Sequence, residues 1–447
     1  MQFPYAEVEF RSTGATHDDA QRRAAVELVA SSGATDVLVL CHGWNNDIPA
    51  ARRLYQRLTD SLAAVRPAVP GAASRTLAVV GALWPSIRWS DEDEVAGGGV
   101  AVGDEAAALT GAIATRVEDP ARAALLTGLV PRLTDSAEAR QQFLDALREQ
   151  LPPRPGPDAT EPDATGVDED PPPAALLHGD AETVFQAVGG PEVDFGLPER
   201  AGGAADTTAG GTADVVADGM ADPAAGGAAG FGFDLDSVLA KARGVLNITT
   251  YYTMKDRAGK VGSGGIATLL PELARASGSG VRLHLAGHSF GARVLAAAAV
   301  RHPRLHSCTL LQGAFSHHGF AVDFNGRGEN GLFRSLLADR QLTGPMLVTH
   351  TVNDRAVGLA YAAASRLARQ AGAGLGDADD PYGGIGRNGA LKTPEVVQPG
   401  VELLEVGGSY QFQPGRVFNL KADRFVSSHG DVTGRQVAYA LYCAISS

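Results

Sequence analysis

The chain has 447 residues, of which 44% are hydrophobic and 20% charged, and its formal net charge is −13. This apolar content excludes global disorder, and the acidic balance argues against a nucleic-acid partner, which would need a basic face. The three cysteines are odd in number and far apart, which excludes a disulfide scaffold and a four-thiolate metal site.

The N-terminal segment carries no targeting signal that the sequence makes visible. Residues 1–10 alternate apolar and polar side chains and lack a basic segment followed by an apolar run, so we expect no signal peptide. A stretch of about 18 uninterrupted apolar residues is absent, so we expect no transmembrane segment. These patterns together predict a soluble, cytoplasmic protein.

Short apolar runs alternate with helical patterns along most of the chain, which predicts an α/β fold whose sheet is mostly parallel and doubly wound. The runs are continuous rather than alternating, as expected for strands that are covered on both faces. We expect strands at 36–41, 76–83, 281–286, 308–312, 346–351 and 416–420, and helices around 54–65, at 293–300 and at 433–445. In such folds the catalytic groups lie on loops at the carboxyl ends of strands.

An insertion interrupts this pattern. Residues 151–230 contain fifteen acidic and two basic residues, so they hold the whole net charge of −13, and they are rich in Pro, Gly and Ala. Such a composition buries too little apolar surface to offset the entropy of ordering. We therefore predict a mostly disordered acidic tract at about 152–230, with one short helix at 181–188.

Two amphipathic helices are predicted just before the acidic tract, at about 119–151. Asp119 and Ser136 are the expected N-caps, and leucines and Phe143 follow at helical spacing. We interpret these helices as a cap over the mouth of a site. The chain then divides into an N-terminal part of the core (1–90), an insertion (91–234) and a C-terminal part of the core (235–447).

The strongest chemical signal is the Gly-His-Ser-Phe-Gly sequence at Gly287–Gly291. It follows an expected strand and precedes an expected helix, which is the context that a nucleophile at a sharp strand-to-helix turn requires. The flanking glycines relieve crowding, and the turn exposes the hydroxyl of Ser289 near a helix N-terminus. The alternative is a chance match in a glycine-rich chain.

A serine alcohol needs a base, and the base needs an orienting acid. In this fold class the chain order is Ser, then Asp or Glu, then His. His429 lies in a polar loop after the last expected strand, where a general base would be delivered. Asp354 directly follows the strand at 346–351 and is the preferred acid, with Asp323 as its main competitor.

The oxyanion of a tetrahedral intermediate needs two backbone N–H donors. We expect one from Phe290, next to the nucleophile, and the other from Trp44, in the loop after the first core strand. His42 in that loop is interpreted mainly as a structural brace. Together with Trp84, at the end of the next strand, it is also expected to contact the substrate.

No metal or cofactor is predicted. The Gly-x-Gly-x-x-Gly match at 384–389 does not follow a strand or run into a helix, as a dinucleotide site would require, and reads as a loop near the site mouth. His317 and His318 lack further ligands at metal spacing.

These residues together resemble the α/β-hydrolase superfamily, in particular a bacterial branch of serine esterases and lipases. The resemblance rests on HGWNN (42–46), WPS (84–86), GHSFG (287–291), NDRAVG (353–358) and SHGDV (428–432), with a further match at 251–259. It covers about residues 36–90 and 235–445 and has no counterpart for the insertion. It implies the α/β-hydrolase fold, with Ser289 as nucleophile, His429 as base and Asp354 as its charge partner.

The expected function is a cofactor-independent serine hydrolase that cleaves a carboxylic ester through an acyl-serine intermediate. Its partner would be a small-molecule or lipid ester substrate. Lipase or serine peptidase activity on the same fold is an alternative, because substrate does not follow from fold. A second alternative is a non-catalytic interaction module whose acidic insertion binds a basic partner.

Overall fold

The computed structural model describes residues 1–44, 46–86, 105–151, 171–188, 235–276, 278, 280–302, 304–357 and 383–447. Within these ranges the chain forms an eight-stranded sheet in which every strand pair is parallel, in the order β1-β3-β2-β4-β5-β6-β8-β7. The strands are β1 (Tyr5–Glu9), β2 (Asp36–Cys41), β3 (Leu77–Leu83), β4 (Arg282–His288), β5 (Ser307–Leu311), β6 (Met346–His350), β7 (Val401–Glu402) and β8 (Val417–Lys421).

The predicted parallel α/β sheet is confirmed, and all six expected core strands are present within one or two residues. Two strands were not predicted, β1 and the two-residue β7, and both lie at the edges of the sheet. Among the described residues, no helix is long and apolar enough to cross a bilayer.

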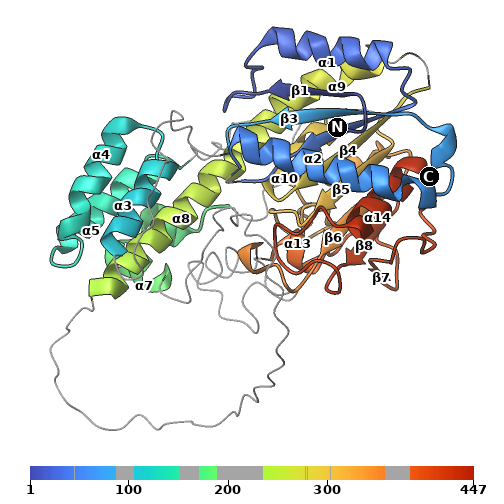
Figure 1. Ribbon diagram of the computed structural model, residues 1–447. Helices are drawn as coiled ribbons and strands as arrows, with labels where there is room; N and C mark the ends of the chain where they lie inside the picture. The colour runs from blue at the N-terminus through green and yellow to red at the C-terminus, as the bar shows by residue number, and fades with distance from the viewer. Residues whose placement is uncertain are drawn as a thin grey trace, which may run out of the picture.

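Helices cover both faces of the sheet (Figure 1). One face packs against α2 (Ile48–Val65) and α14 (Arg435–Ser446). The other packs against α1 (Asp19–Ser31), α8 (Leu235–Lys260), α9 (Ala267–Ala276) and α10 (Phe290–Ala299). Side chains along β2 alternate between the two apolar clusters: Leu38 and Leu40 face α2, and Val37 and Val39 face α10. This double burial explains why the core strands read as continuous apolar runs.

A helical bundle is inserted between β3 and β4. It consists of α3 (Glu105–Arg116), α4 (Pro120–Leu129), α5 (Ala137–Arg148), α6 (Ala174–His178) and α7 (Ala181–Val188). The side chains of Asp119 and Ser136 accept the N-cap hydrogen bonds of α4 and α5, as predicted, and α7 spans the expected range. α3 and α6 were not predicted, and α6 lies in the tract where only one short helix was expected. Residues 152–170 and 189–230, the rest of the expected acidic tract, lie outside the described residues.

The bundle is attached to the sheet through α8, which runs from one to the other (Figure 1). Its apolar side chains belong to the same buried cluster as the α10 face of the sheet. Arg257 of α8 fixes the junction, because its guanidinium donates to the carbonyl of Pro85 (2.8 Å), just beyond β3, and pairs with Glu118 between α3 and α4. The bundle therefore meets the sheet at the carboxyl ends of its strands.

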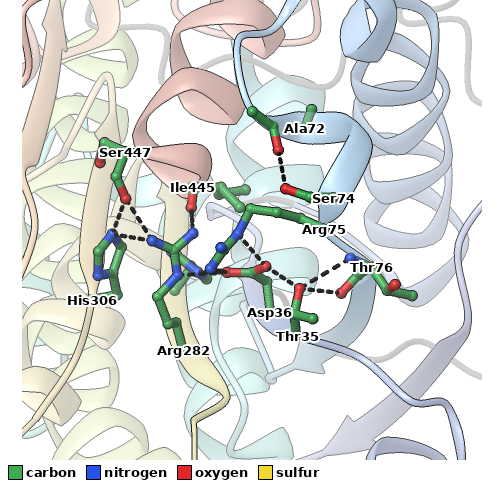
Figure 2. A network of polar contacts seen from close by, with 12 residues as sticks. Thr35, Asp36, Ala72, Ser74, Arg75, Thr76, Arg282, His306, Ile445 and Ser447 are labelled. Carbon is green, nitrogen blue, oxygen red and sulfur yellow. Dashed lines mark hydrogen bonds and ion pairs between the residues drawn. The ribbon is translucent and has the colours of Figure 1, made fainter.

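A buried polar network closes the opposite, amino-terminal edge of the sheet (Figure 2). The Asp36 carboxylate is fully buried and accepts from Arg75 (2.7 Å) and Arg282 (2.9 Å). Arg282 also donates to the carbonyls of Ile445 and Ser447, at the end of α14. Asp36 and Arg282 together thus join β2, β4 and the last helix.

Candidate active site

The candidate site lies where the carboxyl ends of β2 and β4 adjoin. Cys41 of β2 pairs with Gly287 of β4, and the chain then leaves β2 toward α2 on one face and β4 toward α10 on the other. Open α/β sheets bind their ligands at the strand ends where the direction switches in this way. The β2 loop and the turn after β4 lie side by side at this point.

The two loops are in direct contact, and glycines make the contact possible. A Cβ added at Gly43 would lie 2.6 Å from the Cβ of Ser289, and one added at Gly291 would lie 2.3 Å from the carbonyl oxygen of Cys41. Separations below 3 Å are not sterically tolerated between such atoms, so neither position accepts a larger residue without movement. The glycines of the two sequence motifs therefore serve one shared contact.

Ser289 occupies a sharp turn between β4 and α10. Its φ is 56° and its ψ is −125°, a conformation that non-glycine residues rarely adopt. The turn is held by its own backbone: the N–H donates to the carbonyl of Leu311 (3.0 Å), and the carbonyl accepts from Ala292 (3.0 Å) and Ala314 (3.1 Å). The end of β5 and the loop after it thereby hold the backbone of the serine in place.

Asp354 and His429 are 75 residues apart in sequence and meet in space. Nδ1 of His429 donates to Oδ2 of Asp354 at 2.8 Å. Asp354 itself is fully buried, and its other oxygen accepts from the N–H of Val357 (3.0 Å). With Nδ1 donating, the neutral imidazole has its lone pair on Nε2, the atom that can accept a proton from a nucleophile.

The charge of Asp354 sets the basicity of His429. Burial disfavours the imidazolium and lowers the pKa, but the adjacent carboxylate and its hydrogen bond outweigh burial, and the pKa of His429 is raised from its usual value of 6.5. The Asp354 pair thus makes His429 a stronger base while fixing its tautomer.

Asp323, the competing acid, lies elsewhere. It is exposed and its carboxylate accepts from the N–H of Gly328 (2.6 Å) within its own loop. The segment at 384–389 is not the loop that we expected, because it contains the short helix α13 (Ile385–Asn388). Arg387 of this helix donates to the carbonyl of Val352 (2.6 Å), beside the Asp354 turn. This places the segment next to the candidate site.

Trp44 and Phe290, the expected oxyanion donors, pack against each other across the two loops. Their rings meet edge to face with centroids 6.0 Å apart. Phe290 is the first residue of α10, where backbone N–H groups have no acceptor within the helix. The ring contact keeps the Trp44 loop close to this helix start.

His42 and Trp84, which were expected to bind substrate, are each 1% exposed and pack against each other. The rings stack at 5.8 Å, the indole N–H of Trp84 donates to the His42 carbonyl (2.8 Å), and the Trp84 backbone N–H donates to Nε2 of His42 (3.2 Å). Nδ1 of His42 bonds the carbonyl of Gly43 (2.9 Å). Burial lowers the pKa of His42 to about 4, so this imidazole is a neutral brace for the β2 loop.

His288 is a site residue that sequence reasoning missed. Its Nε2–H donates to the backbone carbonyl of His429 at 2.8 Å, and the two rings lie with centroids 4.8 Å apart. The only available signal was its position directly before Ser289, which says nothing about a loop 141 residues away.

His317 and His318 are both buried, with ring centroids 4.1 Å apart. Within the described ranges, no group of three or more His, Cys, Asp or Glu side chains is arranged to hold a metal ion.

No protein-family model matches the chain, and no match was found among the curated proteins or the solved structures.

Proposed function

We propose that the protein is a serine hydrolase that cleaves a carboxylic ester, with Ser289 as nucleophile, His429 as general base and Asp354 as the acid that orients the base. The observation that carries the proposal is the 2.8 Å hydrogen bond between Asp354 and His429, in a loop that also contacts the residue preceding Ser289. An acid–imidazole pair of this tautomer, in contact with the residue next to a serine in a strained turn, supplies the groups that acyl transfer needs.

In the proposed reaction, Oγ of Ser289 attacks the ester carbonyl carbon while Nε2 of His429 takes the hydroxyl proton. The tetrahedral oxyanion accepts from the N–H groups of Phe290 and Trp44. It collapses by breaking the bond to the alkoxy oxygen, which leaves as the alcohol with the proton from His429. Water, activated by the same imidazole, then attacks the acyl-serine and releases the carboxylic acid.

Proton transfer requires Ser289 and His429 to come into contact. Within the described part of the chain, Oγ of Ser289 and Nε2 of His429 make no hydrogen bond, to each other or to another residue. Catalytic hydrogen bonds are commonly long in the free enzyme and tighten when substrate binds. We therefore expect the contact to close in the enzyme–substrate complex.

The strand order and chain order support an α/β-hydrolase assignment. The serine follows β4, the acid follows β6 and the histidine follows β8, so all three leave carboxyl ends of one parallel sheet. The order Ser, Asp, His along the chain is the order of that superfamily. The inserted bundle at the same edge of the sheet would form the cap that selects substrates.

A fluorophosphonate probe tests the proposal, because it reacts with an activated serine and not with an ordinary one. We expect one adduct, mapped to Ser289 by mass spectrometry of the digested protein, and no adduct in Ser289→Ala. Folded wild-type protein that remains unlabelled would favour a non-catalytic role. A panel of p-nitrophenyl esters of graded acyl length, set beside peptide anilides, then separates esterase, lipase and peptidase activity.

A further inference from the structure

His288 lies between the proposed nucleophile and the proposed base. It is the last residue of β4, its side chain points to the α2 face of the sheet, and it is 8% exposed. A carbonyl can only accept a hydrogen bond, so the 2.8 Å contact with the His429 carbonyl requires the proton of His288 to be on Nε2. The ring also packs against the ring of His429, tilted by 42°.

We propose that His288 is a positioning residue, which holds both the backbone and the ring of His429 in place for proton transfer with Ser289. This inference rests on the proposed function. His288 is covalently next to Ser289, so a hydrogen bond from its side chain ties the base to the nucleophile turn itself. Asp354 fixes the imidazole from the Nδ1 side, and His288 fixes the main chain that carries it.

The Nε2–H tautomer of His288 leaves a buried nitrogen unpaired, which lowers stability. A side chain present only for packing would not need this. Nδ1 of His288 is buried, has no hydrogen-bond partner in the described structure, and lies 3.1 Å from where a Cβ at Gly43 would be. Leaving a buried acceptor unpaired costs about 1–3 kcal/mol, whereas an apolar side chain of similar shape would avoid that cost. A histidine here is thus explained by the bond it makes to His429 rather than by stability.

The charge state of the pair also suits the role. The titratable groups around it are Asp354 after β6, His42 in the β2 loop, and Cys41 and Tyr55 against the α2 side of His288. Burial, followed by the neighbouring His429, lowers the pKa of His288 to about 3, so its ring stays neutral. Burial also raises the pKa of Cys41 and of Tyr55, which keeps both neutral. Only His429 then takes up a proton during turnover.

Two amide variants separate the hydrogen bond from general packing. The side-chain nitrogen of Gln reaches the place of Nε2, whereas that of Asn reaches only the place of Nδ1. We expect His288→Asn to lower kcat by about 10–100-fold with little change in KM, because a displaced base loses alignment. His288→Gln should retain kcat within about threefold of the wild type, since it restores the donor.

His302→Asn is the matched control, because His302 is also buried (5% exposed) but lies beyond the far end of α10. It should destabilise the fold without changing kcat. A proton spectrum gives a second readout: the downfield resonance of the His429 Nδ1–H should broaden in His288→Asn and persist in His288→Gln. An Asn variant with wild-type kcat and resonance, or a folded Gln variant as slow as Asn, would overturn the positioning role.

A measurement on unmodified protein covers the case in which the Asn variant does not fold. The ¹⁵N shifts of selectively labelled histidine should show His288 protonated on Nε2 alone, and a proton on Nδ1 would refute the inference. Fluorophosphonate labelling keeps the two proposals distinct. An unlabelled wild type overturns the serine hydrolase and this inference with it, whereas a labelled wild type with an undiminished Asn variant overturns only the positioning role.

Discussion

The backbone of Ser289 is held in a region that costs a non-glycine residue about 1–3 kcal/mol. Its φ of 56° is maintained by three backbone hydrogen bonds, which the peptide groups of Ser289 make with α10, with the last residue of β5 and with the loop after β5. The surrounding structure thus enforces a conformation that the residue itself disfavours. Strain of this kind at a nucleophile lowers stability in exchange for a fixed orientation of the hydroxyl, and Ser289 is only 4% exposed rather than open to solvent as the sequence suggested.

Replacing Ser289 by glycine should reveal this strain. We expect Ser289→Gly to be more stable than Ser289→Ala by about 1 kcal/mol, because only glycine adopts the positive φ freely. Both variants lack the hydroxyl, so the comparison isolates the backbone. Denaturant unfolding of the two proteins measures the difference, and equal midpoints would show that the turn is not strained.

Removing the charge of Asp354 should affect both the rate and its pH dependence. In Asp354→Asn the amide no longer selects the Nδ1–H tautomer of His429, and kcat should fall by about 10³–10⁴-fold. In the wild type the base must be neutral, so activity is lost as pH falls through a His429 pKa that lies above 6.5. The acidic limb of the residual activity in the variant should move to lower pH. An unmoved limb would mean that Asp354 does not set the pKa.

The site residues differ in how far the sequence could predict them. Asp354 was preferred over Asp323 because it directly follows a strand, and the structure pairs it with His429. His288 and the interlocked His42–Trp84 pair could not be foreseen, because their roles depend on contacts between segments that are distant in sequence. Position relative to a strand end is a local pattern, whereas a hydrogen bond across 141 residues is not.

At the scale of elements, the Asp36 network should be essential to the fold. Burial alone would raise the pKa of Asp36, but hydrogen bonds from His284, Arg75 and Thr35 lower it well below its usual range. Asp36→Asn leaves two guanidinium groups without their shared carboxylate, and we expect a loss of about 3–5 kcal/mol in the free energy of unfolding. Urea unfolding at neutral pH measures it.

The lowered pKa of Asp36 also predicts how low pH affects the stability of the wild type. A carboxylate with a depressed folded-state pKa contributes stability above its unfolded value, near 3.9, and loses it as pH falls toward the folded value. The free energy of unfolding of the wild type should therefore fall toward that of Asp36→Asn as the pH is lowered below about 4. A difference in stability that stays constant down to pH 2 would contradict the charge-based account.

The contact between the β2 loop and the nucleophile turn should not tolerate a side chain at Gly43. A Cβ there would lie 2.6 Å from the Cβ of Ser289, so Gly43→Ala must displace one loop. We expect kcat to fall by about 100-fold as the Trp44 N–H moves. Gly111→Ala, at an exposed helical position with nothing within 4 Å, is the control and should leave kcat unchanged while stabilising α3. Equal activity of both variants would exclude the proposed loop role.

Elements buried on both faces were predictable, and edge elements were not. The central strands are short, continuous apolar runs, whereas an amphipathic helix alternates apolar and polar residues with a helical period. β1 buries only Val8, because it lies at the sheet edge, and β7 is two residues long. α3 was missed because it contributes only Leu109 and Ile113 to the core, among alanines.

At the scale of the whole molecule, Arg257 joins the helical bundle to the sheet. Arg257→Gln removes its bond to Glu118 and weakens its bond to the Pro85 carbonyl. If the bundle forms a cap, the variant should change the preference among acyl chain lengths while the rate on the shortest ester changes little. Lys260→Gln, which breaks an exposed ion pair with Asp256 on the same helix, is the control and should change neither. An unaltered preference in Arg257→Gln would contradict the cap.

The sheet pairing constrains the order in which the chain can assemble during synthesis. β2 is a fully buried strand whose partner β4 begins about 200 residues after β3 ends. At a ribosomal rate of about 5–20 residues per second, the edge of this apolar strand that later pairs with β4 has no partner for about 10–40 s. During synthesis we therefore expect β1, β2 and β3 to form a partial sheet whose β2 edge is unpaired. Chaperones in the cell should bind the nascent chain mainly during this interval.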